Sequence, residues 1–156
     1  MNRASSGLAA LFLVAAAPAP AQEAGALPWL SGRWQGSGTM FGNPSEAVLE
    51  VSPTTTGFDL HYRAGRFEGR AVYRPLGGGR WQASWSDNRG VSFPIAAVAD
   101  GQMLTSDWGS AETERGRTVY RLLEDGSLEL VDTVATPGGG SGEFARHRLV
   151  RANSAE

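Results

Sequence analysis

The chain has 156 residues and a formal net charge of −2, from 14 basic and 16 acidic residues. This length provides one domain with a hydrophobic core and is too short for two. The charge balance lacks the basic excess that nucleic-acid binding requires. Cysteine is absent and every basic residue is arginine, which excludes disulfides, thiol catalysis, thiolate metal ligands and Schiff-base chemistry on lysine.

Residues 1–21 have the pattern of a secretory signal peptide. Arg3 provides a short basic start, an apolar run follows as far as Ala17, and an A-x-A cleavage pattern ends at Ala21. The run is too short to span a membrane, although an uncleaved amphipathic anchor is an alternative. Cleavage after Ala21 predicts a periplasmic or secreted protein without a membrane span, and residues 22–156 then form its single domain.

Short runs of β-branched, aromatic and alternating residues fill the chain after Trp29. Asp100-Gly101 and Asp125-Gly126 each lie between two such runs, which is the strongest local signal for a tight β-hairpin. No window has a sustained apolar period near 3.6, so almost no helix is expected. The predicted strands are Arg33–Phe41, Ser45–Val51, Phe58–Arg63, Phe67–Arg74, Arg80–Ser86, Val91–Ala99, Met103–Trp108, Arg117–Leu123, Leu128–Val134 and Glu143–Val150.

Consecutive strands with short connections predict an all-β fold, an antiparallel up-and-down β-barrel of about ten strands. A meander with one apolar face curls until it closes around a core or a ligand cavity. A two-sheet sandwich is the alternative, but sandwiches need longer crossovers than this chain offers. The apolar segment Leu27-Pro28-Trp29-Leu30 is suited to capping one end of such a barrel.

Both ends of the predicted barrel carry a recognisable pattern. Gly32-Arg33-Trp34 opens the first strand, and an arginine-rich run that includes Arg148 and Arg151 belongs to the last. The pair resembles the calycin superfamily of lipocalins, fatty-acid-binding proteins and avidins. The resemblance implies that Gly32 and Trp34 lie at the base of the barrel and that a late arginine, either Arg148 or Arg151, packs across the indole.

The run Trp34-Gln35-Gly36-Ser37-Gly38 is also similar to the start of nitrobindin-type haem barrels and of small exported lipocalin-like domains of unassigned function. The first similarity implies a haem-ligating histidine near His147. Alternation with Tyr62 and Phe144 predicts instead that His61 and His147 both face outward, and the arginines beside His147 are too basic for a haem pocket. Haem binding therefore stays an alternative, with no cofactor and no metal site expected.

Period-two alternation predicts which side chains face the interior. Aromatic residues predominate there, while Gly69, Ala71, Ala83 and Ala97 leave space that a filled core would occupy. Such walls suit a ligand with planar apolar parts and a polar end; the alternative is a solid core. The predicted ligand-binding residues are Tyr62, Tyr73, Trp81, Trp85, Phe93, Trp108, Tyr120 and Arg148.

Arg148 is included because, if its face of the last strand points inward, it would pair with a ligand carboxylate, as the resemblance to fatty-acid-binding barrels implies. A buried guanidinium without an anion is too costly, so Asp132 or a stack on Trp34 are alternative partners. The stack is the favoured role for one of the late arginines.

Motifs of hydrolases, nucleotide-binding loops and metalloproteases are absent. Asp87 and Asp107 flank tryptophans near the predicted rim, and with Tyr120 they form a candidate site for cofactor-independent proton transfer on a carbonyl ligand. Aspartates in such places more often cap turns. The sequence therefore favours an exported barrel that binds a small hydrophobic or aromatic molecule, with a lyase or isomerase as the alternative, and leaves the oligomeric state open.

Overall fold

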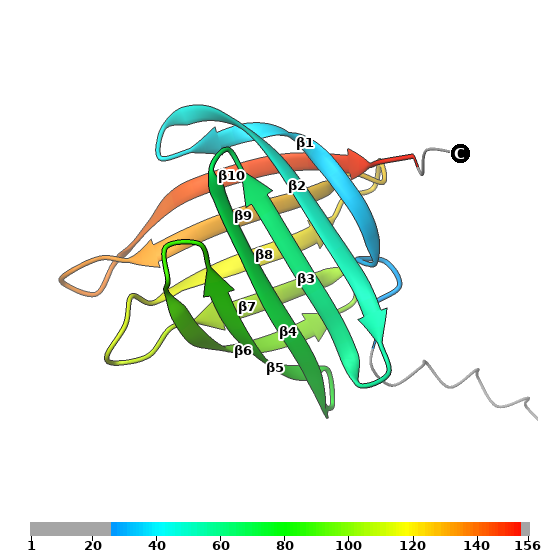
Figure 1. The fold of residues 1–156 in the computed structure, drawn as a ribbon, viewed down its shortest axis with the longest axis horizontal. Helices are drawn as coiled ribbons and strands as arrows, with labels where there is room; N and C mark the ends of the chain where they lie inside the picture. Colours follow the sequence, from blue (N-terminus) through cyan, green and yellow to red (C-terminus); the bar gives the residue numbers. More distant parts are fainter. Residues whose placement is uncertain (1–25, 154–156) are drawn as a thin grey trace, which may run out of the picture.

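The computed structural model of the protein describes residues 26–153, which form ten antiparallel strands without a helix (Figure 1). The predicted signal peptide, residues 1–21, lies outside the described residues. Every predicted strand is present, with bounds that differ by a few residues at most. The strands are β1 Gly32–Met40, β2 Asn43–Thr54, β3 Gly57–Ala64, β4 Phe67–Gly77, β5 Arg80–Asp87, β6 Ser92–Asp100, β7 Met103–Trp108, β8 Gly116–Leu122, β9 Leu128–Ala135 and β10 Ser141–Arg151.

The sheet closes on itself through β1. The spatial order is β1-β10-β9-β8-β7-β6-β5-β4-β3-β2, so each strand pairs with its neighbours in the chain and β1 also pairs with β10. Trp34 in β1 lies opposite Arg151 in β10 and opposite Leu49 in β2. Closure leaves no unpaired edge. The predicted up-and-down barrel is confirmed, and the two-sheet sandwich is wrong.

Side chains alternate between the interior and the outer surface along the strands, because successive residues of a strand point to opposite faces. In β3, Phe58, Leu60 and Tyr62 are buried, whereas Asp59 and Arg63 are exposed. The inward faces predicted for β3 to β8 are confirmed in the same way. Within residues 26–153 no helix is long and apolar enough to cross a membrane.

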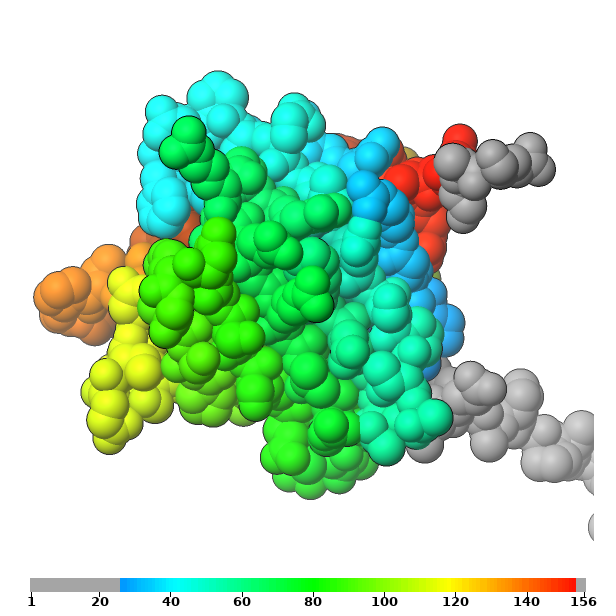
Figure 2. All heavy atoms as spheres, in the orientation of Figure 1, coloured from blue at the N-terminus to red at the C-terminus, as the bar shows by residue number. Residues whose placement is uncertain are grey.

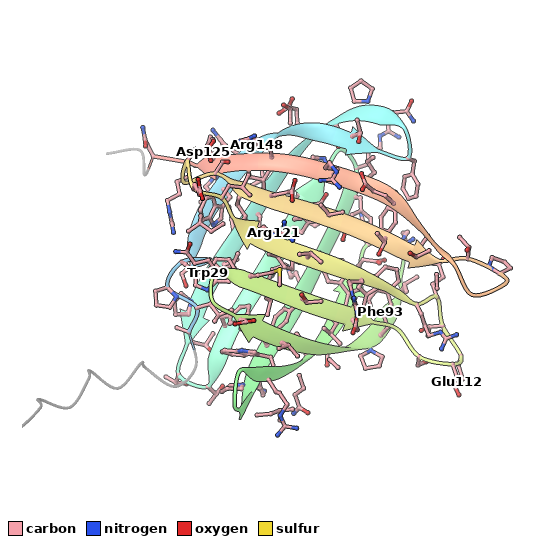
Figure 3. The ribbon with its side chains drawn as sticks, turned by 180° about the vertical axis from the view of Figure 1, so that it is seen from behind. Trp29, Phe93, Glu112, Arg121, Asp125 and Arg148 are labelled. Carbon is pink, nitrogen blue, oxygen red and sulfur yellow. The ribbon has the colours of Figure 1, made fainter. Side chains whose placement is uncertain are left out.

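One end of the barrel is closed by the segment that precedes β1. Trp34 is fully buried, and its indole Nε1 donates a hydrogen bond to the carbonyl oxygen of Leu30 at 2.8 Å. Leu30 is also fully buried, while Leu27 and Trp29 pack against the core. In Figure 3 Trp29 lies at this end and Phe93 lies toward the other. The apolar segment thus caps the barrel as its composition predicts.

Arg151 ties the last strand to this cap. Its guanidinium lies 4.2 Å from the centroid of the Trp34 ring and donates hydrogen bonds to the carbonyl oxygens of Ser31 at 2.7 Å and Trp29 at 3.0 Å. Gly32 makes this possible: its φ is +117°, and a Cβ there would lie 2.8 Å from the Arg151 Nη1. Of the two candidate arginines, Arg151 is the one that stacks on the indole.

Alternate connections of the meander lie at the same end of the barrel. The end opposite the cap is surrounded by five of them: β1–β2, β3–β4, β5–β6, β7–β8 and β9–β10. The β7–β8 and β9–β10 connections, yellow and orange at the left of Figure 2, project furthest beyond the barrel. The β1–β2 turn places Phe41 at positive φ, 49°, and leaves its side chain 69% exposed. This end is the open mouth of the barrel.

Candidate functional site

A cavity of about 230 Å³ lies inside the mouth of the barrel. Six of the eight predicted ligand-binding residues line it: Tyr62, Tyr73, Trp85, Phe93, Trp108 and Tyr120. Trp81 does not, because it packs deeper in the core with its ring 5.0 Å from that of Phe58. The interior therefore has a packed lower half, next to the capped end, and a hollow upper half, next to the mouth. Only the upper half offers space to a ligand.

Six aromatic rings, Phe41, Phe67, Trp85, Phe93, Trp108 and Phe144, follow one another in the upper wall of this cavity and are called the aromatic collar below. Trp85 stacks on Phe67 and on Phe93, with ring centroids 6.1 Å apart in both pairs, and Phe93 lies 5.1 Å from Trp108. Phe144 meets Trp108 edge-on and stacks on Phe41 at 5.3 Å. Rings in offset or edge contact stabilise one another beyond their buried area.

Two glycines make room for the indoles of the collar. A Cβ at Gly69 would lie 2.0 Å from the Trp85 ring, and a Cβ at Gly116 would lie 2.2 Å from the Trp108 ring. Each indole therefore covers a glycine of the neighbouring strand, in a cross-strand arrangement that shields the glycine backbone. The two pairs differ in register: Gly69 lies opposite Asp87, two positions from Trp85, whereas Gly116 lies directly opposite Trp108.

Polar groups gather below the collar. The hydroxyls of Tyr73 and Ser106 are 2.8 Å apart, and both residues are buried. Burial raises the pKa of Tyr73 to about 12, and it also raises the pKa of Tyr62 and Tyr120 well above the ordinary value for tyrosine. All three phenols thus stay protonated near neutral pH, and each can donate a hydrogen bond to a ligand.

Asp132 supplies the carboxyl group of this polar region. It is 8% exposed, lines the cavity from β9 and accepts a hydrogen bond from Thr118 Oγ1 at 2.5 Å. Burial raises its carboxyl pKa from 3.8 to about 7, and the Thr118 bond opposes this only in part. From the sequence, Asp132 is predicted only as a possible partner for a buried arginine. Its position could have indicated that it faces the cavity, because it follows the inward-facing Leu130 by two residues and Leu128 by four.

The two predicted catalytic carboxylates do not come together. Asp107 is exposed on the outer face of β7 and pairs with Arg117 at 2.6 Å. Asp87 lies at the mouth, where burial raises its pKa but hydrogen bonds from Arg89 and from the Trp85 indole lower it more, so that the net shift is downward. Tyr120, the third candidate, is buried and lines the cavity. Asp87 and Asp107 thus form no acid–base pair.

His147 is fully buried, so the prediction that it faces outward is wrong. The register between β9 and β10 shifts between Glu143 and Ala145, and this bulge lets Phe144 and His147 both face the interior despite their odd spacing. His61 does face outward, as predicted, and its Nε2 lies 2.6 Å from a carboxylate oxygen of Glu68.

The surroundings of His147 do not fit haem ligation. Its Nδ1 lies 3.4 Å from the Tyr62 hydroxyl, and its Nε2 has no hydrogen-bond partner within the part of the chain that the structure describes. The ring has no exposed surface and is not part of the cavity wall, so an iron in the cavity does not reach it. Residues 26–153 also hold no cluster of three or more His, Asp or Glu side chains placed to bind a metal.

Arg148 lies on the outer face of β10, outside the cavity. Its guanidinium donates hydrogen bonds to Asp125 and, at 3.0 Å, to Ser127, and Figure 3 shows Arg148 and Asp125 side by side near the capped end. The prediction that Arg148 faces the interior is therefore wrong, and a ligand carboxylate in the cavity has no arginine from β10 to pair with.

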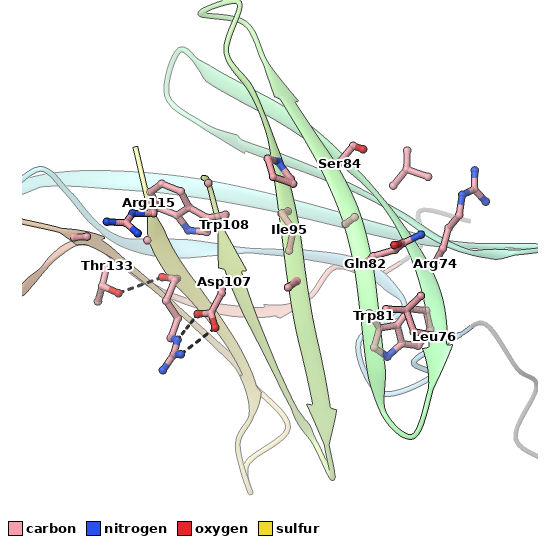
Figure 4. A pocket seen from close by; sticks show the side chains of 18 of the residues that line it. Arg74, Leu76, Trp81, Gln82, Ser84, Ile95, Asp107, Trp108, Arg115 and Thr133 are labelled. Atoms are coloured by element: carbon pink, nitrogen blue, oxygen red, sulfur yellow. Dashed lines mark hydrogen bonds and ion pairs between the residues drawn. The ribbon is translucent and has the colours of Figure 1, made fainter. Parts of the chain in front are cut away.

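A second and wider hollow, of about 1,200 Å³, lies on the outer face of β4 to β9 (Figure 4). Most of its lining side chains, including Arg74, Gln82 and Asp107, are exposed to solvent. Such a surface removes little of a small ligand from water, so the interior cavity is the better candidate site. Comparison with models of known protein families and with curated protein sequences finds no match for this chain.

Proposed function

We propose that this protein binds a small, mainly apolar or aromatic molecule inside the mouth of its barrel. The observation that carries the proposal is a cavity that is closed below by the packed core and walled by aromatic rings, with a few convergent hydroxyls and one carboxyl beneath them. A concave apolar wall with a few placed polar groups is the usual form of a small-molecule site.

The size of the cavity limits the ligand. Its volume of about 230 Å³ is below the range of about 300–1,000 Å³ that is usual for drug-sized ligands. A molecule with one or two rings therefore fits, with its flat part against the collar and its polar end near Tyr73, Tyr120 and Asp132.

The proposal includes membership of the calycin superfamily and export to the periplasm or outside the cell. The stacked pair of Trp34 and Arg151 at the capped end supports the first, because it is the feature that the resemblance implies. The pattern of residues 1–21 supports the second.

The test uses native mass spectrometry of protein purified from its own source, followed by calorimetric titration with indole as a neutral aromatic probe. Val134→Phe places a ring into the cavity wall, and Val150→Phe adds the same ring on the exposed outer face of β10. We expect Val134→Phe to weaken indole binding at least tenfold and Val150→Phe to leave it unchanged. Indole binding that is equal in both variants would contradict an interior site.

A second candidate function, acid–base catalysis on the bound molecule, is favoured by Asp132. A carboxyl with a pKa of about 7 both gives and takes a proton near neutral pH, which suits a general acid or base. This role replaces the one predicted for Asp87 and Asp107. Conversion of a retained ligand by the wild type, lost in Asp132→Asn while binding persists, supports catalysis; ligand released unchanged by the wild type contradicts it.

A further inference from the structure

We propose that the ligand of this cavity is an organic cation, an amine or quaternary ammonium group on an apolar or aromatic body, with Asp132 as its counter-ion and the aromatic collar around its charge. The inference rests on the proposed function, because it names the class of molecule that the same cavity takes. Two independent features carry it: a buried carboxyl that lacks a cation, and a series of six aromatic side chains above that carboxyl.

The carboxyl of Asp132 is incompletely paired. Thr118 donates to one oxygen, Oδ1, whereas an ionised carboxylate has two oxygens and about four sites for hydrogen bonds. Within residues 26–153 no arginine or histidine lies at ion-pair distance from Asp132, since the ion pairs of this part of the chain involve other carboxylates. A buried carboxylate without a cation is unfavourable, so a ligand that brings one gains the pairing free energy.

The groups that face Asp132 from the other strands supply no positive charge. They are Tyr120 from β8, Tyr73 from β4 and Tyr62 from β3, whose phenols burial keeps protonated. Behind Tyr62, His147 of β10 lies 3.4 Å from the Tyr62 hydroxyl, and burial lowers its pKa and so favours its neutral form. The lower part of the cavity is therefore neutral or negative. An anionic ligand would find no counter-ion there, and a wholly apolar ligand would leave Asp132 unpaired.

The collar suits a cation as well as an apolar ring. Aromatic faces attract ammonium and guanidinium groups, and several such rings around one site are a known way to bind quaternary ammonium. The collar already holds one cation, because the Arg89 guanidinium lies 5.2 Å from the centroid of Phe67. Arg89 does not repel a second cation strongly, since Asp87 pairs with it at 2.8 Å and Glu114 adds a further carboxylate to the cavity lining.

The experiment compares benzyltrimethylammonium with neopentylbenzene, its uncharged isostere, by calorimetric titration or by quenching of tryptophan fluorescence. The charge of the quaternary cation is independent of pH, so a change of its affinity with pH reports on the protein. We expect the wild type to bind the cation at least tenfold more tightly than the isostere at pH 8.5. We expect that affinity to fall about 30-fold at pH 5.5, where few Asp132 carboxyls with a pKa of about 7 are ionised.

Asp132→Asn keeps the shape of the side chain and removes its charge, and Asp107→Asn is the matched control on the outer face of the barrel. Asp132→Asn is expected to remove the preference for the cation and its pH dependence while neopentylbenzene still binds, which also shows that the variant is folded. Equal wild-type affinity for both probes, or a cation affinity that does not change with pH, overturns the inference and leaves the interior site standing. Failure of both probes to bind the wild type overturns the inference and the proposed function together.

Discussion

The wild type should lose stability at Asp132 as the pH rises from acid to neutral, and replacement by asparagine should remove that loss. The stability of Asp132→Asn relative to the wild type should therefore increase with pH. Burial raises the folded-state pKa of Asp132 from 3.8 to about 7. Between these pH values the unfolded chain ionises at this position while the folded protein holds its proton. The stability that the protonated carboxyl contributes is thus complete below pH 3.8 and is lost progressively up to pH 7.

The size of the effect follows from the same shift. At about 1.36 kcal/mol for each pH unit, the full loss is about 4 kcal/mol, of which about 3 kcal/mol falls between pH 4.5 and pH 8. Asparagine does not titrate, so the free energy of unfolding of Asp132→Asn minus that of the wild type should rise by that amount over this range. Urea unfolding followed by tryptophan fluorescence measures it in the ligand-free proteins. A difference that stays flat with pH would refute a raised pKa, and Asp107→Asn is the exposed control.

Arg151→Ala should lower the free energy of unfolding by about 2 kcal/mol in urea titrations, because it removes a cation–π contact and two hydrogen bonds to the cap. Arg148→Ala on the outer face should change it little, and equal effects of the two substitutions would contradict the role of Arg151. Gly69→Ala should displace the Trp85 ring and destabilise the fold by about 1–3 kcal/mol, with a shifted tryptophan emission and weaker probe binding; unchanged emission would show that the ring does not cover this glycine. Burial lowers the pKa of His147, so its stabilising contribution is lost as the pH falls below 6.5, and His147→Leu should resist acid unfolding better than the wild type; a steeper loss of stability in that variant would contradict the buried neutral ring.

The barrel and its inward faces could be predicted from the sequence because the information is local. Turn dipeptides such as Asp100-Gly101 mark where strands end, and alternation with a period of two assigns each side chain to a face. Six of the side chains assigned to the interior as ligand contacts accordingly line the cavity. The capping pair of Trp34 and Arg151 was also within reach, since the pattern that carries it lies at two defined places in the chain.

The errors have three causes: an interrupted alternation, a side chain such as Trp81 that packs too deep in the core to reach the cavity, and carboxylates that pair with nearby arginines. A one-residue bulge near Phe144 reverses the faces of the following residues, which turns His147 inward and leaves Arg148 outside. Asp107 belongs to the outer face and Asp87 pairs locally with Arg89, so the predicted carboxylate pair does not form.

The sequence alone determined a closed meander with an aromatic interior, because period and turn chemistry are properties of neighbouring residues. Only the tertiary structure decided how much of that interior is hollow and which carboxyl lies in it. Space depends on how side chains from ten strands fill one volume, and the pKa of Asp132 depends on the water that those strands together exclude. Both quantities arise from residues far apart in the chain, and no local pattern contains them.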